Sequence, residues 1–136
     1  MSGNNGTIPE RYHDLLESPV LAYVATLGPK GEPQTTPVWF GWDGEHLKFS
    51  VTRARQKLRS VSRDPRIALS IVDPENPLWY LEIRGEVERI WEAPDRDFIN
   101  AMAKKYMGRD VYPWRQPGDE RIVIHVVPRH TTQMGS

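Results

Sequence analysis

The sequence contains no cysteine and no excess of charge of either sign, since 18 basic residues balance 18 acidic ones among 136. Without cysteine there is no disulfide framework, no thiolate metal site and no cysteine nucleophile. Proteins that bind nucleic acids or membranes through general electrostatics usually carry a basic excess. A neutral chain therefore argues against a nucleic-acid partner and against a membrane partner.

Long apolar runs are absent as well. No stretch approaches the roughly 20 residues that cross a membrane, and the N-terminal segment has no apolar signal core. We therefore expect a cytoplasmic protein. The length and the ordinary hydrophobic content of 38% predict a single domain. We assign it to residues 9–136, preceded by a flexible N-terminus at residues 1–8.

Several chemical motifs are also missing. The sequence holds neither of the common glycine-rich nucleotide fingerprints, and it lacks the G-x-S-x-G motif of serine hydrolases. The four histidines do not have the spacing of metal ligands, so we expect no metal site. No nucleophile and base form a recognisable pair, so the catalytic residues stay unknown. If the protein is an enzyme, a bound cofactor carries the chemistry.

The chain does contain a series of short segments with the alternation or apolar character of β-strands. Six strands are predicted, at residues 20–27, 34–42, 46–52, 66–73, 78–91 and 121–127. Three helices are predicted, at residues 9–18, 53–65 and 93–108. Hairpins rather than helical crossovers join most strands. This pattern favours a mainly β (α+β) fold, a six-stranded antiparallel Greek-key barrel with peripheral helices.

Two residues inside these strands indicate local geometry. Pro37 has no N–H group, and a proline in mid-strand belongs on a sheet edge or at a bulge. Backbone groups left unpaired there could bond the polar edge of a planar heterocycle, although an ordinary broken edge strand explains the same stretch. Gly85 lies in the middle of the longest strand and predicts a sharp bend or bulge.

Positive charge is concentrated between Phe49 and Asp64. Five basic residues occur there without an acid: Arg53, Arg55, Lys57, Arg59 and Arg63. Ser50 and Thr52 project from the strand face opposite Phe49, and the chain then enters a predicted helix. Hydroxyl groups, guanidinium groups and a helix N-terminus together suit a bound phosphate. A solvated helix face explains the same charges, and the spacing alone leaves both interpretations open.

The stretch from Thr36 to Asp73, followed by W-Y-L-E-I-R-G-E-V-E from Trp79, resembles the split-barrel flavin-binding family related to pyridoxamine 5′-phosphate oxidase. Within that family it looks most similar to the actinobacterial members that use the deazaflavin coenzyme F420. The likeness extends from about Ser18 to Val127. Its most specific parts are the P-V-W-F hairpin, the strand ending in Ser-Val-Thr, and the R-x-K-x-R helix that ends in R-D-P-R.

The resemblance implies a homodimer of six-stranded split barrels that binds its cofactor at the dimer interface. The residues that it implies around the phosphate of the ribityl chain are Ser50, Thr52, Arg55, Gln56 and Lys57. Those that it implies beside the ring are Thr36, Pro37, Val38 and Trp39. Trp79 and Tyr80 would approach the cofactor from the barrel or from the partner subunit. From charge alone, we expect Arg53 and Arg59 to attract the oligoglutamate tail of coenzyme F420.

The implied function is that of an F420H2-dependent reductase. Such an enzyme passes a hydride from the reduced deazaflavin to an electron-poor double bond of a small organic substrate, such as an enone, a quinone or a tetrapyrrole. An oxidoreductase that uses flavin mononucleotide (FMN) is one alternative, because FMN has the same phosphate and a similar ring. A non-enzymatic carrier of a flavin or deazaflavin is the other. The sequence lacks the Arg- and Trp-rich ending of pyridoxamine phosphate oxidases proper, so we do not expect vitamin B6 oxidation.

Overall fold

The computed structural model describes residues 8–52, 56–92, 96–114 and 120–134, and for residues 56–58 and 134 it describes the backbone alone. Its strands are β1 (Ala22–Leu27), β2 (Pro33–Val38), β3 (Gly41–Trp42), β4 (Leu47–Thr52), β5 (Arg66–Asp73), β6 (Asn76–Glu92) and β7 (Arg121–Met134). Its helices are the 3₁₀ turn η1 (Glu10–Tyr12), α1 (His13–Glu17), α2 (Gln56–Arg63) and α3 (Asp97–Met107). None of the helices in these ranges is both long enough and apolar enough to cross a membrane.

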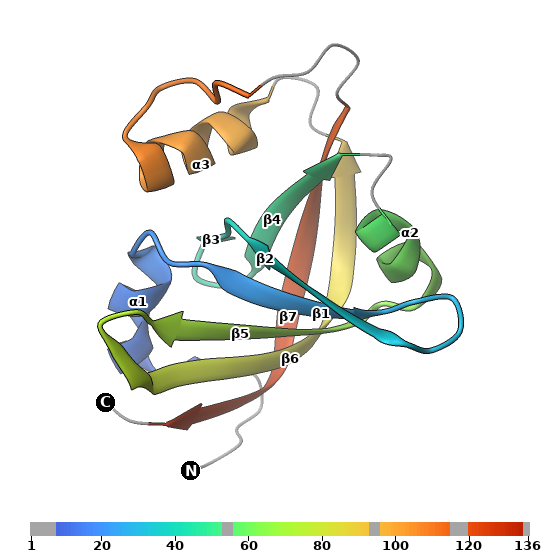
Figure 1. Ribbon diagram of the computed structural model, residues 1–136, viewed down its shortest axis with the longest axis horizontal. Coiled ribbons are helices and arrows are strands. Elements are labelled where there is room, and N and C mark those ends of the chain that lie inside the picture. The colour runs from blue at the N-terminus through green and yellow to red at the C-terminus, as the bar shows by residue number, and fades with distance from the viewer. Residues whose placement is uncertain (1–7, 53–55, 93–95, 115–119, 135–136) are drawn as a thin grey trace.

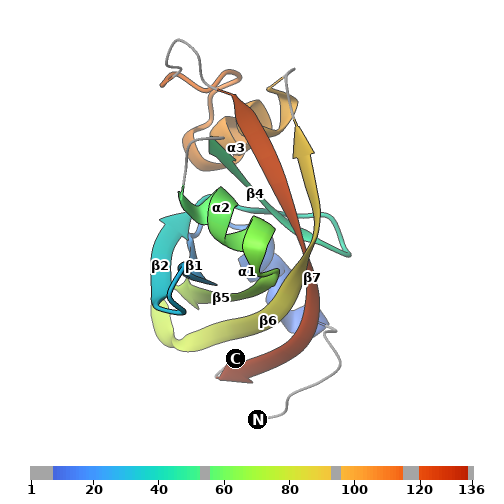
Figure 2. The ribbon, with the colours of Figure 1, turned by 90° about the vertical axis from the view of Figure 1, so that its right-hand side faces the viewer.

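The strands form one sheet in the order β2-β1-β5-β6-β7-β4-β3, and every neighbouring pair is antiparallel. The sheet curls into a half-barrel with the helices at its periphery (Figure 1). In the view of Figure 2, α2 lies across the side of the curl, near β1 and β4. Helix α3 lies at the end where β4 and β6 finish and β7 begins. The predicted fold class is confirmed, but the described residues form seven strands rather than six.

The additional strand arises because the predicted strand 34–42 is broken at Phe40. The Phe40 N–H donates a hydrogen bond to the Tyr106 hydroxyl at 3.1 Å, and the Phe40 carbonyl accepts one from Lys105 Nζ at 2.8 Å. Side chains of α3 therefore form the hydrogen bonds to the Phe40 backbone that a neighbouring strand would form in a continuous ladder. The ring of Phe40 is fully buried, which fixes the break in the core.

Pro37 and Gly85 lie where the sequence predicts. Strand β2 is an edge strand of the sheet, so the missing N–H of Pro37 costs no interior ladder bond. Between Arg84 and Gly85 the register of β6 against β7 shifts by one residue, because Arg129 of β7 is left out of the pairing and forms a β-bulge opposite them. A Cβ atom at Gly85 would come closer than 3.0 Å to the backbone carbonyl oxygen of Val127. Only glycine allows the two strands this close approach.

The hydrophobic core fills the inside of the curl. The predicted alternation in β4 is confirmed, since Leu47, Phe49 and Val51 are buried while the residues between them are only half-buried. Tyr12 of η1 and Leu16 of α1 are also fully buried, so the first helical segment closes part of the core. Strands β5, β6 and β7 supply most of the remaining buried aliphatic side chains.

Helix α3 begins at Asp97, later than the predicted start, and Pro94 and Asp95 lie outside the described residues. It ends as predicted at Gly108, which has a positive φ of 70°. The helix packs against Gly41 in β3, where a Cβ atom would lie 3.2 Å from Met102 Cε. Because Gly41 has no side chain, α3 can lie close to the sheet.

Candidate functional site

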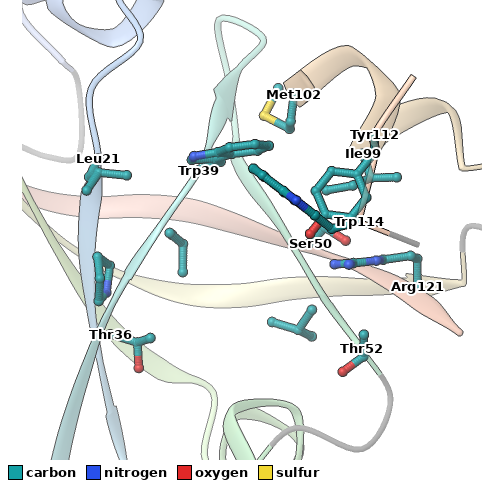
Figure 3. A pocket seen from close by; sticks show the side chains of 13 residues that line it. Leu21, Thr36, Trp39, Ser50, Thr52, Ile99, Met102, Tyr112, Trp114 and Arg121 are labelled. Atoms are coloured by element: carbon teal, nitrogen blue, oxygen red, sulfur yellow. The ribbon is translucent and has the colours of Figure 1, made fainter. Parts of the chain in front are cut away.

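A cavity of about 280 Å³ opens where the end of β2 faces β4 and α3 (Figure 3). Strand β2 and the residue after it contribute Thr36, Pro37, Val38 and Trp39, and β4 contributes Ser50, Val51 and Thr52. Helix α3 and the segment after it contribute Ile99, Met102, Tyr112 and Trp114. Leu21 and Arg121 complete the lining.

The structure brings six of the predicted cofactor-binding residues to this cavity: Thr36, Pro37, Val38, Trp39, Ser50 and Thr52. They come from two strands near opposite ends of the sheet order, β2 and β4. The curl of the sheet places these two strands on either side of one opening (Figure 3). The arrangement agrees with a ligand that contacts both strands.

The other predicted residues are not part of this lining. Trp79 and Tyr80, which the structure describes, lie on β6 away from the cavity. The Trp79 ring packs 5.6 Å from that of Tyr12, centroid to centroid. Arg53 and Arg55 lie outside the described residues, and Gln56 and Lys57 are described by their backbone alone, in the first turn of α2. The expected phosphate site at these residues therefore stays a prediction.

Aromatic rings form the wall on the α3 side. Trp39 lies at the centre, with Tyr106 stacked on it at 5.0 Å between ring centroids and 7° between ring planes. Tyr112 and Trp114 meet Trp39 at 6.0 Å and 6.4 Å, and they meet each other edge to face at 5.7 Å. Trp114 is 57% exposed, so it stands at the mouth of the cavity. Such rings offer flat faces on which a planar ligand can stack.

Hydrogen bonds from α3 hold the backbone near Trp39 in place. The Tyr106 hydroxyl donates to the Val20 carbonyl at 2.6 Å, and Lys105 Nζ donates to the Leu16 carbonyl at 2.9 Å. Burial raises the pKa of Tyr106 to about 12, so its phenol stays neutral. Burial also lowers the pKa of Lys105 to about 8, against the attraction of Glu17. Both side chains act as donors to the backbone beside the cavity.

Two polar atoms in the lining are buried without a hydrogen-bond partner among the described residues, Ser50 Oγ and Arg121 Nε. Arg121, Tyr112 and Trp114 are not among the cofactor-binding residues that the family resemblance implies. Arg121 could have been identified from strand pairing, because it is the first residue of β7 and lies directly opposite Thr52 of β4. That pairing cannot be read from either strand alone.

A planar heteroaromatic group with a polar edge fits this lining. Aromatic and aliphatic side chains provide flat apolar faces, and the unpartnered Ser50 Oγ and Arg121 Nε provide hydrogen-bonding capacity at the edge. In the described part of the chain, no three His, Asp or Glu side chains come together in a way that could hold a metal ion. The chemistry of the donor set therefore suits an organic cofactor or substrate.

Comparison with known proteins agrees with this fold. A solved structure named F420 reductase has a TM-score of 0.83 and 40% sequence identity, covering 92% of this chain and 98% of that one. A conserved hypothetical protein from Mycobacterium tuberculosis has a TM-score of 0.74 at 20% identity, covering 98% and 89%. General stress protein 26 from Bacillus anthracis has a TM-score of 0.69 at 15% identity, covering 92% of each chain. These last two similarities concern the fold alone.

No curated protein was found to match the sequence. The family pattern described as pyridoxamine 5′-phosphate oxidase, in contrast, matches residues 8–135, which is nearly the whole chain. Together with the 40% identity to the F420 reductase, this shows that the chain belongs to the pyridoxamine 5′-phosphate oxidase family.

Proposed function

We propose that the protein is an F420-dependent reductase that transfers a hydride to an electron-poor double bond of a small organic substrate. The observation that carries this proposal is the 40% identity, over 92% of the chain, to the structure named F420 reductase. The aromatic cavity supports it, because the ring of a deazaflavin is flat and has polar groups along one edge. When bound, the coenzyme would supply the hydride, which no side chain can supply.

The described residues suggest how the ring would be held. Thr36, Pro37, Val38 and Trp39 would flank it, since all four line the cavity at the free edge of β2. An edge strand presents unpaired backbone groups, and these can bond the polar edge of a ring. The phosphate of the ribityl chain would be bound by Ser50, Thr52, Arg55, Gln56 and Lys57, of which Gln56 and Lys57 belong to the first turn of α2.

The chain itself would contribute position and exclusion of water. Stacking on Trp39 would fix the plane of the ring, and Trp114 at the mouth would limit the access of water to the reacting atoms. No carboxyl or imidazole group lines the cavity within the described residues.

The cavity also supports the proposal of a homodimer. Its volume of about 280 Å³ is close to the lower limit of roughly 300 Å³ for small-molecule sites, so one subunit encloses little more than a ring. Trp79 and Tyr80 lie outside this lining in their own subunit. In a dimer, Trp79 and Tyr80 of the partner subunit would complete the site around coenzyme and substrate.

Two alternatives follow from the same site. FMN would use the same phosphate contacts, and the family match over residues 8–135 does not separate FMN from F420. A non-enzymatic carrier would use the same ring contacts, and the described lining holds no carboxyl or imidazole group that would argue for acid–base chemistry.

Equilibrium binding of F420 and of FMN to one coenzyme-free preparation tests the proposal. We expect F420 to bind at least about tenfold more tightly, a difference of ~1.4 kcal/mol. The loaded protein is then assayed with a panel of enones, quinones and tetrapyrroles. Tighter binding of FMN would favour the flavin alternative, and tight binding of F420 without turnover of any substrate would favour the carrier.

A further inference from the structure

Charged and imidazole side chains gather on the outer face of β4, β7 and β6, away from the core. Lys48 of β4 and Arg89 of β6 both lie directly opposite His125 of β7. Directly opposed residues of an antiparallel pair project from the same face, so a cation stands on each side of this imidazole. His125 is half-buried, and its Nε2 atom is buried without a hydrogen-bond partner among the described residues. A proton added there would meet positive charge on both neighbouring strands.

A second histidine joins the start of β4 to β6 across the strand between them. The register of β6 against β7 passes from Val87 to Arg89, so Glu88 is left out of the pairing as a bulge. The Glu88 carboxylate lies 2.7 Å from Nε2 of His46, which immediately precedes β4. The ring of His46 lies 6.0 Å from that of His125, centroid to centroid. Glu88 and His46 therefore fasten β4 to β6 beside the buried imidazole.

The carboxylates of this group already have partners. Asp43 accepts a hydrogen bond from the His46 N–H at 2.7 Å, and its other oxygen lies 3.1 Å from Lys48 Nζ. Burial raises the pKa of Asp43, but the backbone N–H groups and Lys48 outweigh burial and lower the pKa to about 2. Asp43 therefore stays charged in mild acid. We call this group the outer-face cluster, and its members are Asp43, His46, Lys48, Glu88, Arg89 and His125.

We propose that His125 is an acid-sensitive switch that loosens the β3–β4 hairpin, residues 41–52, and its attachment to β6. At neutral pH the imidazole is uncharged and Glu88 stays on His46. In acid, Nε2 of His125 gains a proton and becomes a buried charged donor that needs an acceptor. Asp43 and Glu88 are the carboxylates of the cluster, so one of them must leave its present partner. Either exchange breaks a contact that holds the hairpin in place.

The charges around the imidazole set the direction of this effect. Burial lowers the pKa of His125, and the charges of Lys48 and Arg89 lower it further. His46 acts in the same direction, whereas Asp43 opposes it. Below about pH 6.5, the ordinary pKa of histidine, the unfolded chain therefore binds a proton that the folded chain does not yet bind. The folded state loses stability as the pH falls through this range.

Both helical layers of the fold rest on the same hairpin. A Cβ atom at Gly41 would lie 3.2 Å from Met102 Cε, so β3 and α3 are in close contact. The ring of Trp42, also in β3, lies 6.3 Å from that of His13 in α1. Loosening of the hairpin in acid would therefore loosen the packing of α3 and α1 as well.

The first experiment follows His125 itself, in the full chain without coenzyme. The Cε1–H resonances of the four histidines are titrated by NMR and assigned with single His→Gln variants. We expect His125 to titrate below an unperturbed histidine, and Lys48→Met to raise its midpoint. Lys104→Met, which removes an exposed cation of α3, is the matched control and should leave the midpoint unchanged. A midpoint at or above the ordinary value, or one that Lys48→Met does not move, would overturn the proposal.

The second experiment measures hydrogen exchange of peptides from the hairpin and from α3 at about pH 7.5 and about pH 5.5. Wild type and His125→Gln are compared at the same pH, so the intrinsic dependence of exchange on pH cancels. Relative to the variant, we expect the wild-type hairpin to exchange about tenfold faster at the lower pH than at the higher. His130→Gln, on the same strand but outside the cluster, should behave as the wild type.

An equal ratio of exchange rates at the two pH values would show that His125 does not act on the hairpin, and the proposal would fail. If His125→Gln does not fold, Lys48→Met gives the same comparison. That variant frees Asp43 to accept the proton of His125, so its hairpin should also exchange more slowly than that of the wild type in acid. Faster or equal exchange in Lys48→Met would count against the switch.

Discussion

Tyr106 stacks face to face on Trp39, with 5.0 Å between the ring centroids and 7° between the ring planes. The two residues lie in different parts of the chain, Tyr106 near the end of α3 and Trp39 just after β2. The hydroxyl of Tyr106 is also bonded to the backbone of Val20 and of Phe40. The Tyr106 side chain thus supports both the Trp39 ring and the backbone next to it at Phe40.

Removing this hydroxyl should weaken the fold without removing the stack. In Tyr106→Phe the Val20 carbonyl and the Phe40 N–H each lose a hydrogen bond, of 2.6 Å and 3.1 Å. We expect the free energy of unfolding to fall by about 1–3 kcal/mol, measured by urea denaturation. Tyr23→Phe is the control, because Tyr23 is 47% exposed. Equal losses in both variants would contradict the role given to the Tyr106 hydroxyl.

Trp39 should matter for ligand binding. Trp39→Ala removes the central ring of the aromatic wall, and the loss of one stacking contact weakens binding by ~1–3 kcal/mol. We expect the Kd for coenzyme F420 to rise by about tenfold or more in an equilibrium titration, and Trp39→Phe to restore part of the affinity. Trp91→Ala serves for comparison, since Trp91 is 49% exposed and outside the lining. An unaltered Kd in Trp39→Ala would exclude stacking on this ring.

Gly85, which lies opposite the bulge in β7, should not accept a side chain. In Gly85→Ala the new Cβ would meet the Val127 carbonyl oxygen, a backbone atom that cannot move without shifting β7. We expect a loss of about 1–3 kcal/mol in the free energy of unfolding. Gly28→Ala is the matched control, because there the new Cβ would meet only the movable carboxylate of Glu32. If the two variants unfolded alike, the close approach at Gly85 would not be what limits this position.

Lys105 should make stability depend on pH in the alkaline range. Burial lowers the pKa of Lys105 from 10.5 to about 8, and the nearby carboxylate of Glu17 opposes part of that decrease. Between these two values the unfolded chain holds a proton that the folded chain has released, so a rise in pH favours the folded state. The neutral amine still has two N–H groups for the carbonyls of Leu16 and Phe40.

Urea denaturation at pH values from 7 to 10 tests this linkage. The free energy of unfolding of the wild type should increase above pH 8 relative to that of Lys105→Met, and the difference should be flat below pH 8. Parallel curves for the two proteins over the whole range would mean that Lys105 keeps an ordinary pKa.

Features set by local sequence were predictable. The alternation of β4, the edge position of Pro37, the bulge at Gly85 and the helix end at Gly108 each follow from a residue and its immediate neighbours. Each of these rules concerns backbone geometry over a few residues. The sheet class follows from the number of such strands and from the short connections between them.

Features set by distant contacts were not predictable. The break between β2 and β3 depends on Tyr106, which lies 66 residues from Phe40 in the sequence. The cavity depends on the curl that brings β2 near β4, and the place of Arg121 depends on its register with Thr52. The family resemblance predicted Thr36–Trp39 as site residues. The position of Arg121 beside the cavity follows only from the pairing of β4 with β7.

The docking of α3 has a consequence for how such a protein can change. Lys105 and Tyr106 attach the helix to the backbone of Leu16 in α1, of Val20 before β1 and of Phe40 between β2 and β3. The rings at the mouth follow the helix, at residues 112 and 114. The residues that attach the helix are thus separate from the residues after it that line the cavity. Substitutions in the segment after the helix can alter which molecules are accepted while the scaffold beneath keeps its shape, so new specificities can evolve here at little risk to folding.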